Sequence, residues 1–125
     1  MKPTVLVIED DRAILAAIRD ILEMEGYETH CSSNGKEALT YLDGGTRPCL
    51  ILLDLMMPVM DGVEFRKIQE RNPKISDIPI ALMSADGNVD VKRFNIGAQE
   101  CLRKPVDLME LLGTVKKYCG SPNEK

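Results

Sequence analysis

Short apolar runs alternate with longer amphipathic segments along the chain, in five rounds. The first short run, Val5 to Ile8, has no polar interruption, as expected of a parallel strand that is covered on both faces. A short strand followed by a helix is the pattern of a βα unit. The runs that predict the five strands cover residues 5–8, 27–31, 50–53, 78–83 and 100–103.

The segments between the strands have apolar residues at helical spacing, and turn-forming residues bound them. In the first segment Ile14, Ile18 and Leu22 recur at this spacing, and Gly26 provides a C-terminal stop. Residues 57–62 contain Pro and Gly, which predicts a loop before the third helix. The five predicted helices lie between Asp11 and Gly26, Gly35 and Gly44, Val63 and Pro73, Val89 and Asn95, and Leu108 and Cys119.

Right-handed crossovers place helices on both faces of such a sheet. We therefore expect an α/β fold with a doubly wound five-stranded parallel sheet in the order 2-1-3-4-5, a flavodoxin-like (βα)5 arrangement. In this fold ligands bind beyond the carboxyl ends of the strands, where the first and third strands flank the reversal of strand order. Residues 1–120 should form this one domain, and residues 121–125 a polar tail.

Composition supports a globular domain of 125 residues, because a hydrophobic fraction of 44% can build a core without a metal or a disulfide. The 16 Lys and Arg against 20 Asp and Glu leave a net charge of −4. This balance argues against direct nucleic-acid binding and against an anionic membrane surface. No run approaches the ~18 apolar residues of a membrane span, and no targeting segment is visible. We therefore expect a cytoplasmic domain without membrane insertion.

The four cysteines show no pattern of a metal site. They contain no CxxC pair and no cluster with the one His at zinc-ligand spacing, which excludes a zinc finger. Because the apolar content can make a core unaided, we expect reduced thiols rather than a disulfide scaffold. The four positions are Cys31, Cys49, Cys101 and Cys119.

Polar side chains follow the carboxyl ends of four of the predicted strands, so the fold should gather them in one site at the carboxyl-terminal edge of the sheet. Three of the carboxylates there, those of Glu9, Asp10 and Asp54, face the single ammonium group of Lys104, a balance that favours raised pKa values or capture of a cation. Carboxylates with a few waters are the ligands that Mg²⁺ prefers, and the same groups could hold the charge of a phosphoryl group. The residues are Glu9, Asp10 and Asp11 after the first strand, Asp54 after the third, Ser84 after the fourth and Lys104 after the fifth.

Four ordered motifs resemble the receiver domain of two-component response regulators, similar to single-domain chemotaxis regulators, over residues 4 to 119. They are Val-Ile-Glu-Asp-Asp at 7–11, Leu-Leu-Asp-Leu-Met-Met-Pro-Val-Met-Asp-Gly at 52–62, Met-Ser-Ala at 83–85 and Lys-Pro at 104–105. The resemblance implies a phosphoacceptor that takes a phosphoryl group from a phosphohistidine of a sensor histidine kinase or a histidine phosphotransfer protein. It also implies output through protein contacts with a downstream target, and stoichiometric rather than enzymatic chemistry.

The resemblance assigns roles to most of the residues of this site. It makes Asp54 the phosphoacceptor, Asp10 the direct Mg²⁺ ligand, and Glu9 a ligand partly through water, with the backbone carbonyl of Met56 completing the metal shell. Two further groups would contact the phosphoryl oxygens: the hydroxyl of Ser84 and the ammonium of Lys104, aimed by a cis Lys104-Pro105 peptide. The sequence departs from the family at Cys101, where receivers commonly have Tyr or Phe three residues before the lysine.

Two other functions compete with this interpretation. Hydrolases that form an aspartyl phosphate typically carry a second Asp two positions after the nucleophile, but this position is Met56, and no insert could form a substrate cap. A nucleotide-binding protein is disfavoured because GxGxxG and GxxxxGK[ST] motifs are missing. Simpler roles are expected nearby: Asp11 as a helix N-cap, His30 as a structural residue, and Met57 and Met60 as loop-packing groups.

Overall fold

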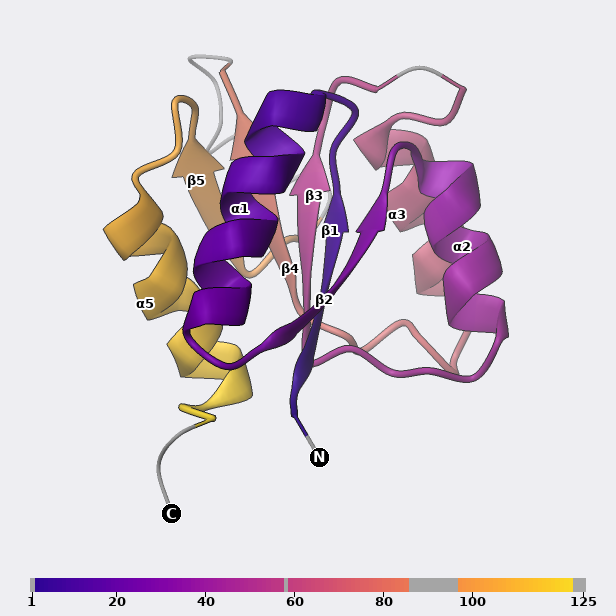
Figure 1. Cartoon of the computed structure of the whole chain (residues 1–125). Helices are drawn as coiled ribbons and strands as arrows, with labels where there is room; N and C mark the ends of the chain where they lie inside the picture. The colour runs from indigo at the N-terminus through magenta and orange to yellow at the C-terminus, as the bar shows by residue number, and fades with distance from the viewer. Residues whose placement is uncertain (1, 58, 86–96, 123–125) are drawn as a thin grey trace.

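The computed structural model describes residues 2–57, 59–85 and 97–122. Its strands are all parallel and form one sheet in the order β2-β1-β3-β4-β5, as predicted (Figure 1). The predicted helix at 89–95 lies outside the described residues. The elements are β1 (Thr4–Ile8), α1 (Arg12–Met24), β2 (Glu28–Ser32), α2 (Gly35–Asp43), β3 (Leu50–Asp54), α3 (Gly62–Arg71), β4 (Ile80–Ser84), β5 (Glu100–Arg103) and α5 (Leu108–Cys119).

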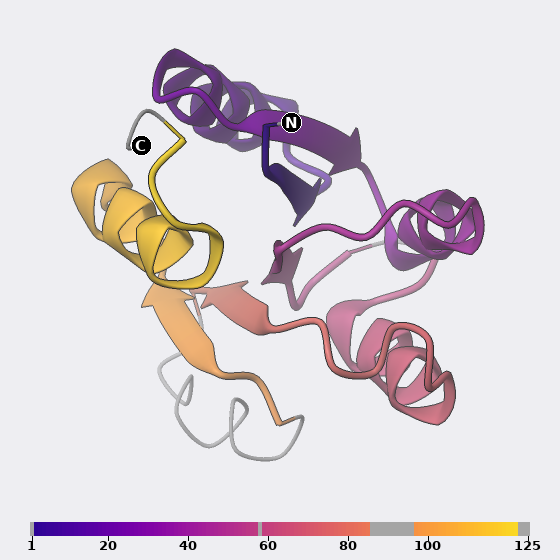
Figure 2. The same ribbon diagram turned by 90° about the horizontal axis from the view of Figure 1, so that it is seen from below.

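Helices cover both faces of the sheet. Figure 2 shows α1 and α5 on one side and α2 and α3 on the other. Along β1 the side chains of Val5 and Val7 join the core under α1 and α5, whereas Leu6 and Ile8 join the core under α2 and α3. All five residues of β3 and of β4 are buried, which explains why these runs show no polar alternation. Within the part of the chain that the structure describes, no helix could cross a membrane.

Asp and Asn side chains begin the four helices of the described residues. Asp11 caps α1, as predicted, because its Oδ1 accepts from the backbone N–H of Ala13 and Ile14 at 2.9 and 3.2 Å. The corresponding caps are Asn34 for α2, Asp61 for α3 and Asp107 for α5. These caps fix the residue at which each helix starts after the strand that precedes it.

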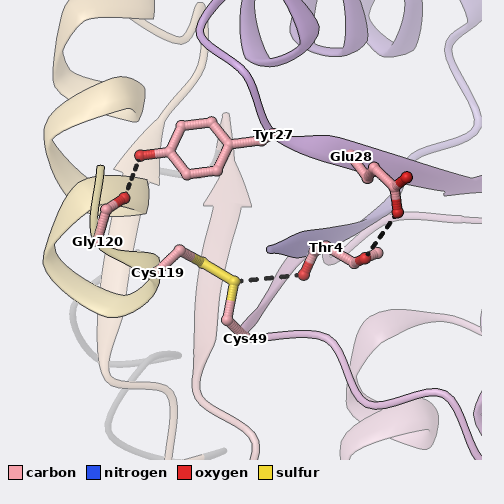
Figure 3. Close-up of a disulfide and its surroundings, with 6 residues drawn as sticks. All are labelled: Thr4, Tyr27, Glu28, Cys49, Cys119 and Gly120. Atoms are coloured by element: carbon pink, nitrogen blue, oxygen red, sulfur yellow. Dashed lines mark hydrogen bonds between the residues drawn. A yellow bond between two sulfur atoms is a disulfide. The ribbon is translucent and has the colours of Figure 1, made fainter. Parts of the chain in front are cut away.

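The expectation of four reduced thiols is wrong for two of the cysteines. Cys49, just before β3, and Cys119, the last residue of α5, form a disulfide (Figure 3). They are 70 residues apart in sequence, and only the packing of α5 over the sheet brings the two ends together. Among the described residues, Cys31 and Cys101 lie outside any disulfide.

Candidate functional site

The strand ends place the predicted residues at one edge of the sheet. Glu9 directly follows β1 and is fully buried, while Asp54 ends β3 and is 3% exposed. Ser84 ends β4 and is buried as well. Lys104 follows β5, and its backbone N–H donates to the carbonyl of Ser84 at 2.9 Å. The sheet itself therefore positions the acceptor, the hydroxyl and the lysine.

Three carboxylates gather at this edge. Oxygen atoms of Glu9, Asp10 and Asp54 all lie within 4.8 Å of one another, and Asp10 is the exposed member of the three. The ammonium group of Lys104 lies 2.7 Å from Oε1 of Glu9 and 3.2 Å from Oδ1 of Asp54. The predicted cluster is thus present, with one cation between two buried acids.

Burial and charge shift the ionisation of the cluster. Burial, together with the hydrogen bond and the charge of Asp54, raises the pKa of Glu9 to about 7, although Lys104 opposes the shift. Burial lowers the pKa of Lys104, but its hydrogen bond to Glu9 and the charge of Asp54 outweigh this and leave that pKa raised. Lys104 is therefore charged at neutral pH, whereas Glu9 titrates near neutrality.

The donor set fits a hard divalent cation. Among the described residues, the metal-ligating groups that converge here are oxygen atoms, from three carboxylates that carry more negative charge than Lys104 neutralises. Such a set suits Mg²⁺ and offers nothing to a soft metal. Met56, whose backbone carbonyl is a further ligand by the family resemblance, lies beside the cluster, and its backbone N–H donates to Oδ1 of Asp54 at 3.3 Å.

A close packing contact that sequence reasoning missed supports the acceptor. A Cβ atom at Gly62 would lie 2.8 Å from the backbone oxygen of Asp54 and 3.0 Å from the Cα of Leu55. The N–H of Gly62 donates to the carbonyl of Leu55, and Asp61 caps α3 through the N–H of Glu64. The Asp-Gly pair at the start of a helix was the available signal. Its glycine lets α3 begin directly against the end of β3.

The neighbouring residues have the simpler roles expected of them. Met57 and Met60 pack against the core under α2 and α3, which confirms that they pack the loop onto the core. The ring of His30 stacks on Tyr41 with centroids 3.7 Å apart, away from the carboxylates at the strand ends. The Lys104-Pro105 peptide is cis, as the resemblance implied. Cys101 is half-buried in β5, paired with Leu82, and packs against the same core as Met57.

Comparison with known proteins gives a consistent result. Residues 5–116 match the family described as the response regulator receiver domain. The transcriptional regulatory protein CrdR of Helicobacter pylori is 35% identical over 119 residues, covering 94% of this chain and 55% of that protein. The polar-differentiation response regulator DivK of Brucella anthropi is 33% identical over 122 residues, covering 96% of this chain and 98% of that protein.

The fold agrees with this match. The crystal structure of a putative response regulator from Chloroflexus aurantiacus superimposes with a TM-score of 0.87 at 28% identity, covering 95% of this chain and 98% of that one. The chain spans about half the length of several curated relatives, CrdR included. Because the family match covers most of the chain and includes every strand end described above, this chain belongs to the response regulator receiver domain family.

Proposed function

We propose that the chain is a phosphoacceptor in which Asp54 takes a phosphoryl group from a phosphohistidine of a sensor histidine kinase or a histidine phosphotransfer protein. The observation that carries this proposal is the buried carboxylate of Asp54, 3.2 Å from the ammonium of Lys104 and within a carboxylate cluster. The modified domain would act through contacts with a downstream protein. Membership of the receiver family supports each part of this proposal.

The proposed transfer forms one bond and breaks one. A carboxylate oxygen of Asp54 attacks phosphorus, the N–P bond of the donor breaks, and the imidazole leaves with the electron pair. The acyl phosphate adds negative charge beside two other acids, so the charge must be balanced where it develops. Lys104 supplies a charge-assisted hydrogen bond, and the hydroxyl of Ser84 at the end of the neighbouring strand supplies a second contact.

Mg²⁺ is the cofactor that the donor set favours. Asp10, Glu9 and Asp54 would hold it, together with the backbone carbonyl of Met56. When bound, the ion neutralises the carboxylates and the phosphoryl oxygens. Because Asp10 is exposed, it can exchange a water for the cation at little cost, whereas Glu9 must first lose its proton or its contact with Lys104.

Intact mass after incubation with acetyl phosphate tests the assignment. We expect one phosphoryl adduct in the presence of Mg²⁺, and none in Asp54→Asn or with a chelator. Asp61→Asn is a matched control, because Asp61 caps α3 and asparagine can replace it in that role. An equal adduct in Asp54→Asn would overturn the proposal.

A hydrolase that works through an aspartyl phosphate is the alternative from another class. Met56 stands where such an enzyme typically has its second Asp, and this residue is 75% exposed. We therefore propose stoichiometric chemistry rather than turnover. Release of many equivalents of product from a model phosphoester would favour the hydrolase, whereas a single equivalent per chain supports the receiver function.

A further inference from the structure

The Cys49–Cys119 disulfide lies at the opposite end of the sheet from Asp54 and takes no part in the proposed transfer. Cys49 precedes β3, which ends at Asp54, and Cys119 ends α5, which begins four residues after Lys104. The disulfide therefore joins the segment just before β3, which runs toward the site, to the end of α5, which runs away from it. It is the one covalent link between distant segments in the described part of the chain.

Solvent can reach the pair. Both cysteines are only half-buried. Cys119 lines an open groove with Lys2, Gly26, Gly120 and neighbouring residues. An external thiolate that enters this groove would meet Cys119, and Lys2 places a positive charge in the same groove. The disulfide is thus placed where exchange is possible, unlike one enclosed in a core.

The fold can accommodate both redox states. The sulfur of Cys49 lies 3.3 Å from the carbonyl of Thr4, so a reduced thiol would find an acceptor without rearrangement (Figure 3). The hydroxyl of Tyr27 donates to the carbonyl of Gly120, just beyond Cys119. Reduction would therefore leave α5 anchored by non-covalent contacts, while it removes the link at the last turn.

Other contacts hold the body of α5. Leu111, Leu112 and Val115 are buried in the core against the sheet. In the last turn no residue from 116 to 119 is fully buried, although Tyr118 and Cys119 pack partly against the core. Lys117 and Tyr118 also each contact the carboxylate of Glu100 at 2.7 Å, and the Lys117 pair is exposed. Exposed pairs of this kind contribute little. The last turn of α5 is therefore the part that depends most on the disulfide.

We propose that Cys49 and Cys119 form a reversible dithiol–disulfide pair that determines whether the last turn of α5 is fixed to the sheet. The reductant is a dithiol, either a small molecule or a protein. One of its thiolates attacks the sulfur of Cys119, and the Cys49–Cys119 bond breaks. Cys49 leaves as a thiolate and takes a proton. The second thiol of the reductant then displaces Cys119, so that two electrons and two protons pass to the pair and the reductant ends as a disulfide.

Thiol counting tests the redox step independently of phosphorylation. The native protein is equilibrated in buffers of reduced and oxidised dithiothreitol, quenched in acid, denatured, alkylated and weighed. We expect two labels per chain under oxidising conditions and four under reducing conditions, with full return on reoxidation. The double variant Cys31→Ser/Cys101→Ser should also gain two labels on reduction, from none to two. The double variant Cys49→Ser/Cys119→Ser should carry two labels under both conditions and show no transition. Four labels under all conditions, or two labels that persist in excess dithiol, would overturn the proposal.

Hydrogen exchange of the native protein tests the structural step. After reduction, we expect amides at the end of α5, residues 116–120, to exchange at least about 10-fold faster, while amides of β1 and β3 stay protected. Reduction of Cys31→Ser/Cys101→Ser should give the same change. Unchanged exchange in the last turn would show that the disulfide fixes nothing. Faster exchange throughout the sheet would show that it holds the whole fold rather than one helix end, and either result overturns the proposal.

Discussion

The ammonium group of Lys104 lies closer to Glu9, at 2.7 Å, than to the proposed acceptor Asp54, at 3.2 Å. Lys104 follows β5 at one edge of the sheet, and Glu9 follows β1, which is separated from β5 by the two strands β3 and β4. The side chain of Lys104 therefore reaches across the carboxylate cluster in the unmodified protein. On the proposed function, a phosphoryl group on Asp54 would compete with the buried carboxylate of Glu9 for this ammonium group, so we expect Lys104 to respond to the change of state.

Lys104→Ala should therefore uncouple phosphorylation from its conformational effect. The variant should still bind Mg²⁺, because removal of a positive charge leaves the three carboxylates with a greater need for a cation. It should lose the amide shifts that beryllium fluoride and Mg²⁺ produce near Ser84 in the unaltered protein. Lys117→Ala is a matched control, since that lysine also pairs with a glutamate at 2.7 Å but on the surface. Equal shifts in Lys104→Ala would mean that the lysine plays no part in the response.

Gly62→Ala should destabilise the protein because its side chain would clash with the end of β3. The added methyl would meet the backbone oxygen of Asp54 at 2.8 Å, and backbone on both sides cannot rotate away. We expect a loss of about 1–3 kcal/mol in the free energy of unfolding, measured by urea denaturation. Gly113→Ala in α5 is the control: nothing lies within 4 Å of its Cβ, and helix propensity predicts a gain of about 0.5–1 kcal/mol. A neutral Gly62→Ala would refute the close contact.

Stability without metal should fall as pH rises through the titration of Glu9. Burial raises the pKa of this carboxyl from 4.5 to about 7, so between these values the folded protein binds more protons than the unfolded chain. Unfolding free energy then decreases with pH, by an amount on the order of 3 kcal/mol between about pH 4.5 and pH 7.

Urea denaturation at about pH 5 and about pH 8 in the presence of a chelator measures this dependence. Glu9→Gln should flatten it, because the amide keeps the shape of the side chain and does not titrate. Asp107→Asn is a control at an exposed helix cap, and it should leave the dependence unchanged. Greater stability at the higher pH in the unaltered protein would contradict the expected ionisation of Glu9.

Sequence patterns predicted the sheet because parallel strands have a simple signature. The run at 50–53 corresponds to β3 (Leu50–Asp54), and both faces of that strand are buried. The predicted strand at 78–83 begins late instead, at Ile80, because Pro79 has no N–H to donate to the ladder. The strand ends followed directly from this order, which is why the cluster of Glu9, Asp10 and Asp54 could be located before the fold was known.

Long-range side-chain pairing could not be predicted in the same way. The disulfide joins Cys49 to a residue 70 positions away, at the amino-terminal edge of the central strands, and it requires that α5 pack against the sheet. Likewise, the sequence placed Lys104 at the site but not its preference for Glu9 over Asp54. The disulfide and the Lys104–Glu9 contact both depend on three-dimensional packing, which hydrophobic periodicity does not predict.

Cys101 predicts a limited conformational response on the side of β5 and α5. Receivers commonly have an aromatic residue here that moves inward when the hydroxyl equivalent to Ser84 is drawn to the phosphoryl group. Cys101 is half-buried and packs against the core under α2 and α3, and its small thiol cannot fill a pocket that an aromatic ring would enter. The phosphoryl oxygens can still draw Ser84, because that motion does not need the ring.

Amide shifts on addition of beryllium fluoride and Mg²⁺ measure this difference. With the Cys49–Cys119 disulfide intact, we expect large shifts beside Ser84 and small ones around Cys101 and along α5. Cys101→Tyr supplies the missing ring and should enlarge the shifts along β5 and α5, whereas Cys31→Ser, at another half-buried thiol on β2, should not. If the unaltered protein shows shifts around Cys101 as large as those beside Ser84, the small side chain does not limit the response.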